Sequence, residues 1–123
     1  MKFSEEFNST AYRISGYGVY WVQVNQQRLT SSFLISSDTL ITTWPPQSFA
    51  TLETQHLDAL FNIGAEVILI GTGKRQQLPS PAVWQALVNN GAGFEIMTTD
   101  AVCRTYNVLL AEARRVAAAI FLN

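Results

Sequence analysis

The strongest constraint on the fold is the run AEVILI, residues 65–70, which ends in four large apolar side chains in succession. Such a short apolar run is typical of a strand buried on both faces, as in a parallel sheet that helices cover on both sides. A glycine turn at residues 71–73 follows it, and Ser80 and Pro81 then supply an N-cap and a first helical residue. This order of strand, turn and helix predicts an α/β domain.

The first third of the chain has a different pattern, in which β-forming residues are separated by polar turns. The three β-rich stretches are residues 20–25 (YWVQVN), 29–36 and 39–44 (TLITTW). Pro45 and Pro46 end the last of them. We therefore expect an N-terminal antiparallel hairpin unit.

The rest of the chain alternates between helical and strand patterns. Helical spacing of apolar residues predicts helices over 52–61 and from Pro81 to about residue 90, and residues 94–97 are strand-like. Thr98 or Thr99 is expected to cap a further helix that ends near Ala113.

The last segment, VAAAIFL (residues 116–122), is ambiguous, because its alanines favour a helix while its larger residues alternate as in a strand. We interpret it as a buried strand. The whole chain, 1–123, is thus predicted to be a single α/β domain. It would have a central mixed β-sheet, an N-terminal antiparallel hairpin unit and helices packed on the sheet.

Composition narrows the class of protein. The 123 residues are 48% hydrophobic and 14% charged, with a net charge of −1, as expected for one globular domain. The basic residues form no stripe, so no nucleic-acid partner is expected. The N-terminal segment MKFSEEFNSTAY has no apolar core, which argues against a signal peptide. No run approaches the roughly 20 apolar residues of a membrane span, so no membrane insertion is expected.

The chain has one cysteine, Cys103, and one histidine, His56. A single cysteine forms no internal disulfide, which fits a reducing cytoplasm. Structural zinc sites use roughly three or four nitrogen or sulfur ligands, which this chain does not offer. We therefore expect a cytoplasmic protein without a metal site or a cofactor.

The glycine turn does not match the common nucleotide motifs. A Walker loop would need glycine at Ile68 and serine or threonine at Arg75, and a dinucleotide fingerprint would need glycine at Gln76. Two interpretations remain. In one, the glycines only turn the chain. In the other, residues 65–70 and 94–97 are parallel neighbours, and the glycine turn and Thr98 border a crevice at their carboxyl ends. Lys74 or Arg75 would recruit a small anion there.

The predicted C-terminal helix carries polar residues opposite its apolar stripe. Val102, Tyr106 and Leu109 form the stripe, whereas Arg104 and Asn107 lie on the other side. Asparagine is unfavourable within a helix unless its amide has a partner. We therefore expect a cover over this second side, formed either by the hairpin of the same chain or by another protein.

Two stretches of the sequence, residues 67–73 (VILIGTG) and 94–122, resemble the domain-of-unknown-function 498 family. This family includes mitochondrial respiratory complex I assembly factor three and the adipogenesis-associated domain protein. The likeness covers roughly residues 44–122, and Ala113 departs from it where glycine is expected. The matching points are the glycine turn, Glu95-x-Met97-x-Thr99, Ala101-x-x-Arg104-Thr105-Tyr106-Asn107, Glu112-x-Arg114 and Val116-x-Ala118-Ala119.

The resemblance implies an α/β fold with a central mixed sheet, and it supports a final strand. It brings no established reaction, cofactor or catalytic residue. The best-understood members of the family act as assembly factors through contacts with other proteins.

The remaining candidates for chemistry have simple structural explanations. Cys103 is expected to be a buried thiol and His56 a residue at the surface or its boundary. Glu95 would form a salt bridge with Arg104 or Arg114, although a raised pKa would suit a general base. The three tryptophans are expected to belong to the core: Trp21, Trp44 and Trp84.

Our preferred hypothesis is a non-enzymatic protein-binding module that resembles respiratory complex I assembly factors, with a homodimer as a further possibility. The alternative is a small-anion or small-molecule binding protein, or an enzyme, with a crevice between the glycine turn and the start of the C-terminal helix. Arg104 would then carry the negative charge of the ligand. The ligand-binding residues of that alternative are Gly71, Thr72, Gly73, Lys74, Thr98, Thr99, Arg104 and Asn107.

Overall fold

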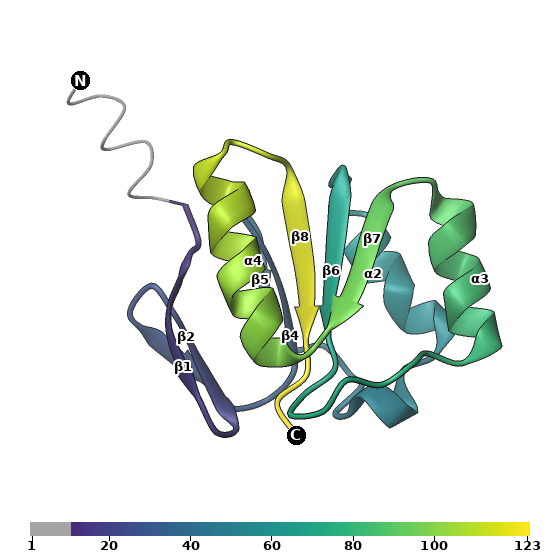
Figure 1. Cartoon of the computed structure of the whole chain (residues 1–123), viewed down its shortest axis with the longest axis horizontal. Coiled ribbons are helices and arrows are strands. Elements are labelled where there is room, and N and C mark those ends of the chain that lie inside the picture. Colours follow the sequence, from purple (N-terminus) through teal and green to yellow (C-terminus); the bar gives the residue numbers. More distant parts are fainter. Residues whose placement is uncertain (1–10) are drawn as a thin grey trace.

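Figure 1 shows the computed structural model, which describes residues 11–123. The expectation about a signal peptide concerns a segment that lies almost wholly outside these residues. The strands are β1 (Ile14–Gly18), β2 (Trp21–Val24), β3 (Gln27–Leu29), β4 (Phe33–Ser36), β5 (Leu40–Ile41), β6 (Val67–Gly71), β7 (Gly93–Met97) and β8 (Val116–Ile120). The helices are α2 (Leu57–Phe61), α3 (Pro81–Asn90) and α4 (Thr99–Ala111), and two 3-10 turns, Phe49–Thr51 and Thr54–His56, precede α2.

The strands form two sheets. The small sheet is antiparallel, in the order β1-β2-β3, and the large sheet has the order β5-β4-β8-β6-β7. In the large sheet, β6 runs parallel to both β7 and β8, whereas β4 runs antiparallel to β8 and β5. The mixed central sheet, the N-terminal antiparallel unit and the final strand are therefore all confirmed.

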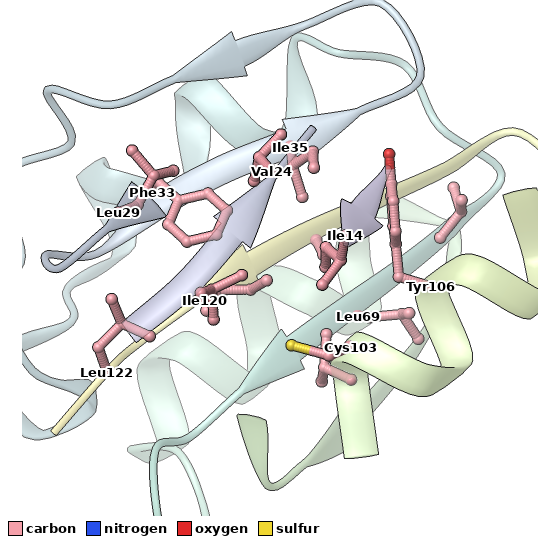
Figure 2. Packing of buried hydrophobic residues seen from close by; sticks show 14 residues of the cluster. Ile14, Val24, Leu29, Phe33, Ile35, Leu69, Cys103, Tyr106, Ile120 and Leu122 are labelled. Carbon is pink, nitrogen blue, oxygen red and sulfur yellow. The ribbon is translucent and has the colours of Figure 1, made fainter. Parts of the chain in front are cut away.

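Alternation along the central strands divides the core into two layers. Leu69 and Ile120 point into a layer beneath α4 and the small sheet, while Ile68 and Ile70 point into a layer beneath α2 and α3. Figure 2 shows the first layer, where Phe33 and Ile35 of β4 meet Cys103 and Tyr106 of α4 and Val24 of β2. The central strands are buried on both faces, as the apolar run after Ala65 predicted.

Local signals set the ends of the two long helices. Ser80 accepts a hydrogen bond from Val83 N at 3.2 Å, and Pro81 follows it as the first residue of α3. Thr98 plays the same part at the start of α4, where its hydroxyl accepts from Ala101 N at 3.4 Å. The alternative cap, Thr99, lies inside the helix. Both caps satisfy N–H groups that the first helical turn leaves free.

Three predictions about the elements were wrong in detail. The stretch 29–36 is not one strand, because its two ends belong to different sheets and the hydroxyl of Ser32 donates to the carbonyl of Pro46 between them. The stretch 39–44 forms a strand only at Leu40–Ile41, since Trp44 leaves the sheet to enter the core, where its ring N–H donates to His56 O at 3.1 Å. The helix over 52–61 is regular only in α2, after two 3-10 turns.

Candidate functional site

The two chain reversals that the sequence singles out meet at one edge of the large sheet. Gly71 of β6 is paired with Met97 of β7 in parallel register, and Thr72 N donates to Met97 O at 2.9 Å. The carboxyl end of β8 lies at the same edge, because Gly71 is also in register with Ile120. Ligands of α/β sheets bind at this kind of edge.

Residue 73 must be glycine in this arrangement. Its φ of +96° is unfavourable for residues with a Cβ, and a Cβ would overlap the carbonyl oxygen of Asn123. Gly73 N donates to Thr99 Oγ1 at 2.9 Å, and Thr99 N donates back to Gly73 O at 3.0 Å. The Thr99 hydroxyl in turn donates to Phe121 O at 2.5 Å. These bonds join the glycine turn, the start of α4 and the segment after β8 into one rigid base.

A pocket of about 250 Å³ lies beside this base, and we name it the hairpin pocket. The tip of the β1–β2 hairpin forms one wall, and the glycine turn and the first turn of α4 form another. Its lining residues are 17–20, 73–74, 98–100 and 121–122.

The pocket contains half of the predicted ligand-binding residues. Gly73, Lys74, Thr98 and Thr99 line it. Gly71 and Thr72 do not; they support the base, since a Cβ at Gly71 would lie 2.8 Å from Thr99 Oγ1 and the Thr72 hydroxyl donates to Arg75 O at 2.6 Å.

Arg104 and Asn107, the other two predicted ligand residues, bind the chain's own hairpin. An Arg104 N–H donates to the hydroxyl of Tyr17 at 3.2 Å, and this hydrogen bond raises the pKa of the guanidinium. Asn107 accepts from Ile14 N at 3.0 Å and donates to Ile14 O at 2.7 Å, so both halves of its amide are engaged. The hairpin of the same chain therefore contacts the second side of α4 at Arg104 and Asn107, which is a partial cover because Arg104 remains exposed.

Tyr106 strengthens this contact between α4 and the hairpin. Its hydroxyl donates to Tyr12 O at 2.7 Å, and its ring is fully buried. Burial raises the pKa of this phenol. Cys103, one turn earlier, is also fully buried, and burial raises the pKa of its thiol to about 12. The predicted buried thiol is thus confirmed.

The remaining charged candidates lie apart from the pocket. Arg114 pairs with Glu66 at 3.3 Å rather than with Glu95, which is exposed. A hydrogen bond from the backbone N–H of Arg115, followed by one from Arg114, lowers the pKa of the Glu66 carboxyl. His56 is half-buried, and its Nδ1 accepts from Glu53 N at 2.9 Å.

Residues 11–123 contain no group of three or more histidine, cysteine or acidic side chains placed to hold a metal ion. Within the same residues, no helix is long and apolar enough to cross a membrane.

A second surface was not anticipated from the sequence. The outer side of α3, which we name the α3 face, consists of Pro81, Trp84, Gln85, Val88 and Asn89, all exposed. Trp84 is 47% exposed and Val88 49% exposed, so the expectation that Trp84 belongs to the core is wrong. Its ring packs edge-on against Phe94 of β7, with centroids 5.2 Å apart.

The other two tryptophans differ from Trp84. Trp44 is 3% exposed and belongs to the core, as predicted. Trp21 is half-buried, and the guanidinium of Arg28 lies 3.9 Å from the centre of its ring.

Solved structures with this fold include two bacterial proteins. A crystal structure of a Bordetella parapertussis protein superposes with a TM-score of 0.85 at 34% identity, over 93% of this chain and 98% of that one. A Xanthomonas campestris protein solved by NMR has a TM-score of 0.82 at 42% identity, over 90% of this chain and 84% of that one.

A curated relative and a family model also match. The relative is a protein of Francisella tularensis called the 13 kDa major membrane protein, which is 36% identical over 70 residues. That match spans 57% of this chain and 57% of the relative's length. The family model described as "Protein of unknown function (DUF498/DUF598)" matches residues 14–121, which is most of the chain. The chain therefore belongs to the DUF498/DUF598 family.

Proposed function

We propose that this chain is a non-enzymatic protein-binding module and that the α3 face is its docking surface. The observation that carries the proposal is a tryptophan exposed on a helix without charge. No Asp, Glu, Lys or Arg occurs between Arg75 and Glu95, a segment that includes all of α3. An ordinary surface helix carries charged residues on its outer side.

The composition of the α3 face is that of an interface centre. Such centres are depleted of charged residues and enriched in aromatic ones, and tryptophan is prominent among residues that dominate binding energy. Trp84 offers a large apolar surface, and its packing against Phe94 limits the freedom that the ring would lose on binding. Val88 lies one helical turn away and extends the apolar area.

We further propose that the partner is a protein engaged in assembling a membrane respiratory complex. The support is the family, whose best-understood members are assembly factors of respiratory complex I. The name of the Francisella relative, a major membrane protein, fits a partner that lies at a membrane. The identity of the partner is thus inferred from relatives, whereas the docking surface is inferred from the residues of this chain.

Photo-crosslinking in the source cells tests both parts. A photoreactive phenylalanine analogue at Gln85 places the probe between Trp84 and Val88 in sequence, and the same analogue at Val108 of α4 is the control. Val108 is 56% exposed, so both positions are accessible. We expect an adduct with a respiratory-complex subunit or assembly protein from position 85, none from position 108, and loss of the adduct with Trp84→Ala. No adduct from position 85, or an adduct made only of two copies of this chain, would contradict the proposal.

A second candidate function is small-molecule binding in the hairpin pocket. It is favoured by the position of this pocket at the carboxyl ends of β6, β7 and β8. The two functions use different surfaces, so they are tested separately.

A further inference from the structure

The base of the hairpin pocket leaves few polar groups for a ligand. The hydroxyl of Thr99 is used twice, by Gly73 N and Phe121 O, and the hydroxyl of Thr98 caps α4. Phe121 and Leu122 add apolar surface at the same level. The base therefore supplies shape and apolar contact, and it resists deformation because its hydrogen bonds are internal.

Three polar side chains of the pocket lining make no direct polar contact with residues 11–123. Lys74, Asp100 and Tyr20 form no hydrogen bond or ion pair within that part of the chain. All three are exposed to solvent in the free protein. A ligand can therefore bind them without first breaking a hydrogen bond or an ion pair, although Asp100 has an electrostatic interaction with Arg104 on the same helix.

Lys74 and Asp100 carry opposite charges on neighbouring parts of the wall. Each directly follows one member of the Gly73–Thr99 pair, whose backbones are bonded at 3.0 Å. They nevertheless form no ion pair with each other. A ligand with one positive and one negative group would satisfy both charges at once.

A phosphate is a poorer match, although the pocket adjoins the start of a helix. Asp100 would repel a dianion, and it already complements the positive end of the α4 dipole. Thr99 N is bonded to Gly73 O and Ala101 N to Thr98, so these N–H groups are not available to an anion.

The size and polarity of the hairpin pocket further restrict the class of ligand. At about 250 Å³ the pocket is smaller than the range of about 300–1,000 Å³ that suits drug-sized ligands. Tyr17, Val19 and Phe121 make much of its wall apolar. A small molecule with an apolar body and two opposite charges fits these limits.

We propose that the hairpin pocket binds a free α-amino acid with an apolar side chain, whose carboxylate pairs with Lys74 and whose ammonium pairs with Asp100. This assignment rests on the second candidate function, since it names the ligand class of that pocket. The Tyr17 hydroxyl, whose oxygen accepts from Arg104, retains its own proton to donate to the carboxylate.

Thermal unfolding with a ligand panel tests the assignment. L-leucine and L-phenylalanine at about ten times their Kd should raise the Tm by about 4–7 °C. Leucinamide lacks the carboxylate and N-acetyl-leucine lacks the ammonium, so each should shift the Tm by less than about 1 °C at the same concentration. Inorganic phosphate should have no effect.

Two variants test whether the ligand binds in the hairpin pocket. Lys74→Gln and Asp100→Asn should each weaken the affinity for leucine, measured by calorimetry, about tenfold or more. Arg75→Gln and Asp58→Asn remove a neighbouring cation and a first-turn acid of α2 outside the pocket lining, and both should leave the affinity unchanged. All four sites are exposed, so the variants should unfold at nearly the native Tm.

The failures are distinguishable. Equal stabilisation by leucine and leucinamide would overturn the pairing of a carboxylate with Lys74, and stabilisation by phosphate alone would overturn the amino-acid assignment; either result would still leave a ligand pocket. If no compound shifts the Tm or the amide resonances of Gly73 and Tyr20 at about 100 times a millimolar Kd, small-molecule binding in this pocket fails as well. Neither result affects the α3 face.

Discussion

Helices α3 and α4 pack against the same sheet, yet they meet different surroundings on their outer sides. Helix α4 is held between the large sheet and the hairpin, with Tyr106 buried and Asn107 bonded to the backbone of β1. Helix α3 buries Val83 and Leu87 and leaves Trp84 in solvent. Both helices have more apolar residues than one buried stripe needs. In α4 the hairpin of the same chain contacts Tyr106 and Asn107 and leaves Val108 exposed, whereas Trp84 and Val88 of α3 stay exposed together and form the surface that we propose for a partner.

The asparagines of the two helices show the same contrast. Asn107 bonds to a strand 93 positions away in sequence. Asn89 accepts only from Gln85 on its own helix, and both side chains are exposed. Asn107, within α4, is therefore structural because it bonds to the hairpin, whereas Asn89, near the end of α3, faces solvent and should be nearly neutral for stability.

The largest expected difference is between the reactivity of the native thiol Cys103 on α4 and that of a thiol introduced on α3. With a pKa of about 12 against an ordinary 9.0, Cys103 has a thiolate fraction about a thousandfold lower at pH 8. Alkylation of native protein should be slower than that of unfolded protein by at least this factor. In a Cys103→Ala background, Val88→Cys on α3 should react at the unfolded rate. Mass spectrometry of timed aliquots measures both, and rapid alkylation of native Cys103 would show that α4 is not held as described.

The same thiol has a consequence at alkaline pH. Because its folded pKa is raised, the neutral thiol is favoured by the fold, and this contribution to stability is fully present below about pH 9. It is lost as pH rises from 9 towards 12. The Cys103→Ala variant should therefore lose less stability than the native protein over that interval.

The next largest effect is the loss of the Asn107 contact. Asn107→Ala leaves the N–H and C=O of Ile14 without partners in a partly buried position, which should lower the free energy of unfolding by about 2–3 kcal/mol. Asn89→Ala on α3 should change it by less than about 0.5 kcal/mol. Urea denaturation of the two variants gives the comparison. Equal losses would mean that the hairpin contributes little to holding α4.

A smaller effect is expected at the centre of the α3 face. Trp84→Ala should cost about 1 kcal/mol, mostly from the contact with Phe94, against about 3–5 kcal/mol for a fully buried aromatic residue. Its effect on the proposed partner should be much larger than its effect on the fold. A loss above 3 kcal/mol in urea denaturation would instead identify Trp84 as a core residue.

The smallest expected effect on stability is a gain rather than a loss, and it concerns the C-terminal ends of the two helices. Helix α3 ends at Gly91, with φ +91°, and α4 is followed by Ala113, with φ +61°. Ala113 N and Arg114 N donate to Leu110 O and Leu109 O at 3.0 Å each, a hydrogen-bond pattern that normally uses glycine. The resemblance to the family predicts glycine at this position, and the structure shows that alanine keeps the turn at the cost of strain.

Ala113→Gly should therefore stabilise the protein by about 0.5–1 kcal/mol. The reverse substitution on α3, Gly91→Ala, should lower the free energy of unfolding by about 1 kcal/mol. This loss is purely conformational, because an added Cβ would have no atom of a non-adjacent residue within 4 Å. Measurements of Tm on the two single variants test both expectations, a higher Tm for Ala113→Gly and a lower Tm for Gly91→Ala. A destabilising Ala113→Gly would mean that the positive φ there is not a strained one.

Local patterns in the sequence were sufficient to predict much of the fold. The apolar run before Gly71, the cap at Thr98 and the Ser80-Pro81 start each depend on a few adjacent residues. The parallel pairing of β6 and β7, which the crevice interpretation of the glycine turn assumed, is present in the structure. These features are predictable because the interactions that specify them are short in range.

The candidate site was predictable only in part, for a physical reason. The glycine turn and the start of α4 are visible in the sequence because they interrupt regular patterns. The opposite wall, at Tyr17 and Tyr20, depends on how the hairpin folds over α4, and the bond from Arg104 to Tyr17 joins residues 87 positions apart. No local signal encodes such a contact. Trp84 was misplaced for a similar reason, since helical spacing shows which residues share a side but not whether anything covers it.

The position of β8 has a consequence for how the molecule is made. Among the described strands β8 comes last in the sequence, yet it lies between β4 and β6 and joins the two halves of the large sheet. A nascent chain on the ribosome that has not reached Val116 has the β4–β5 and β6–β7 pairs but nothing to connect them. Its apolar strand edges must then remain soluble, or be shielded by chaperones, until residues 116–120 have been made and can pair with them.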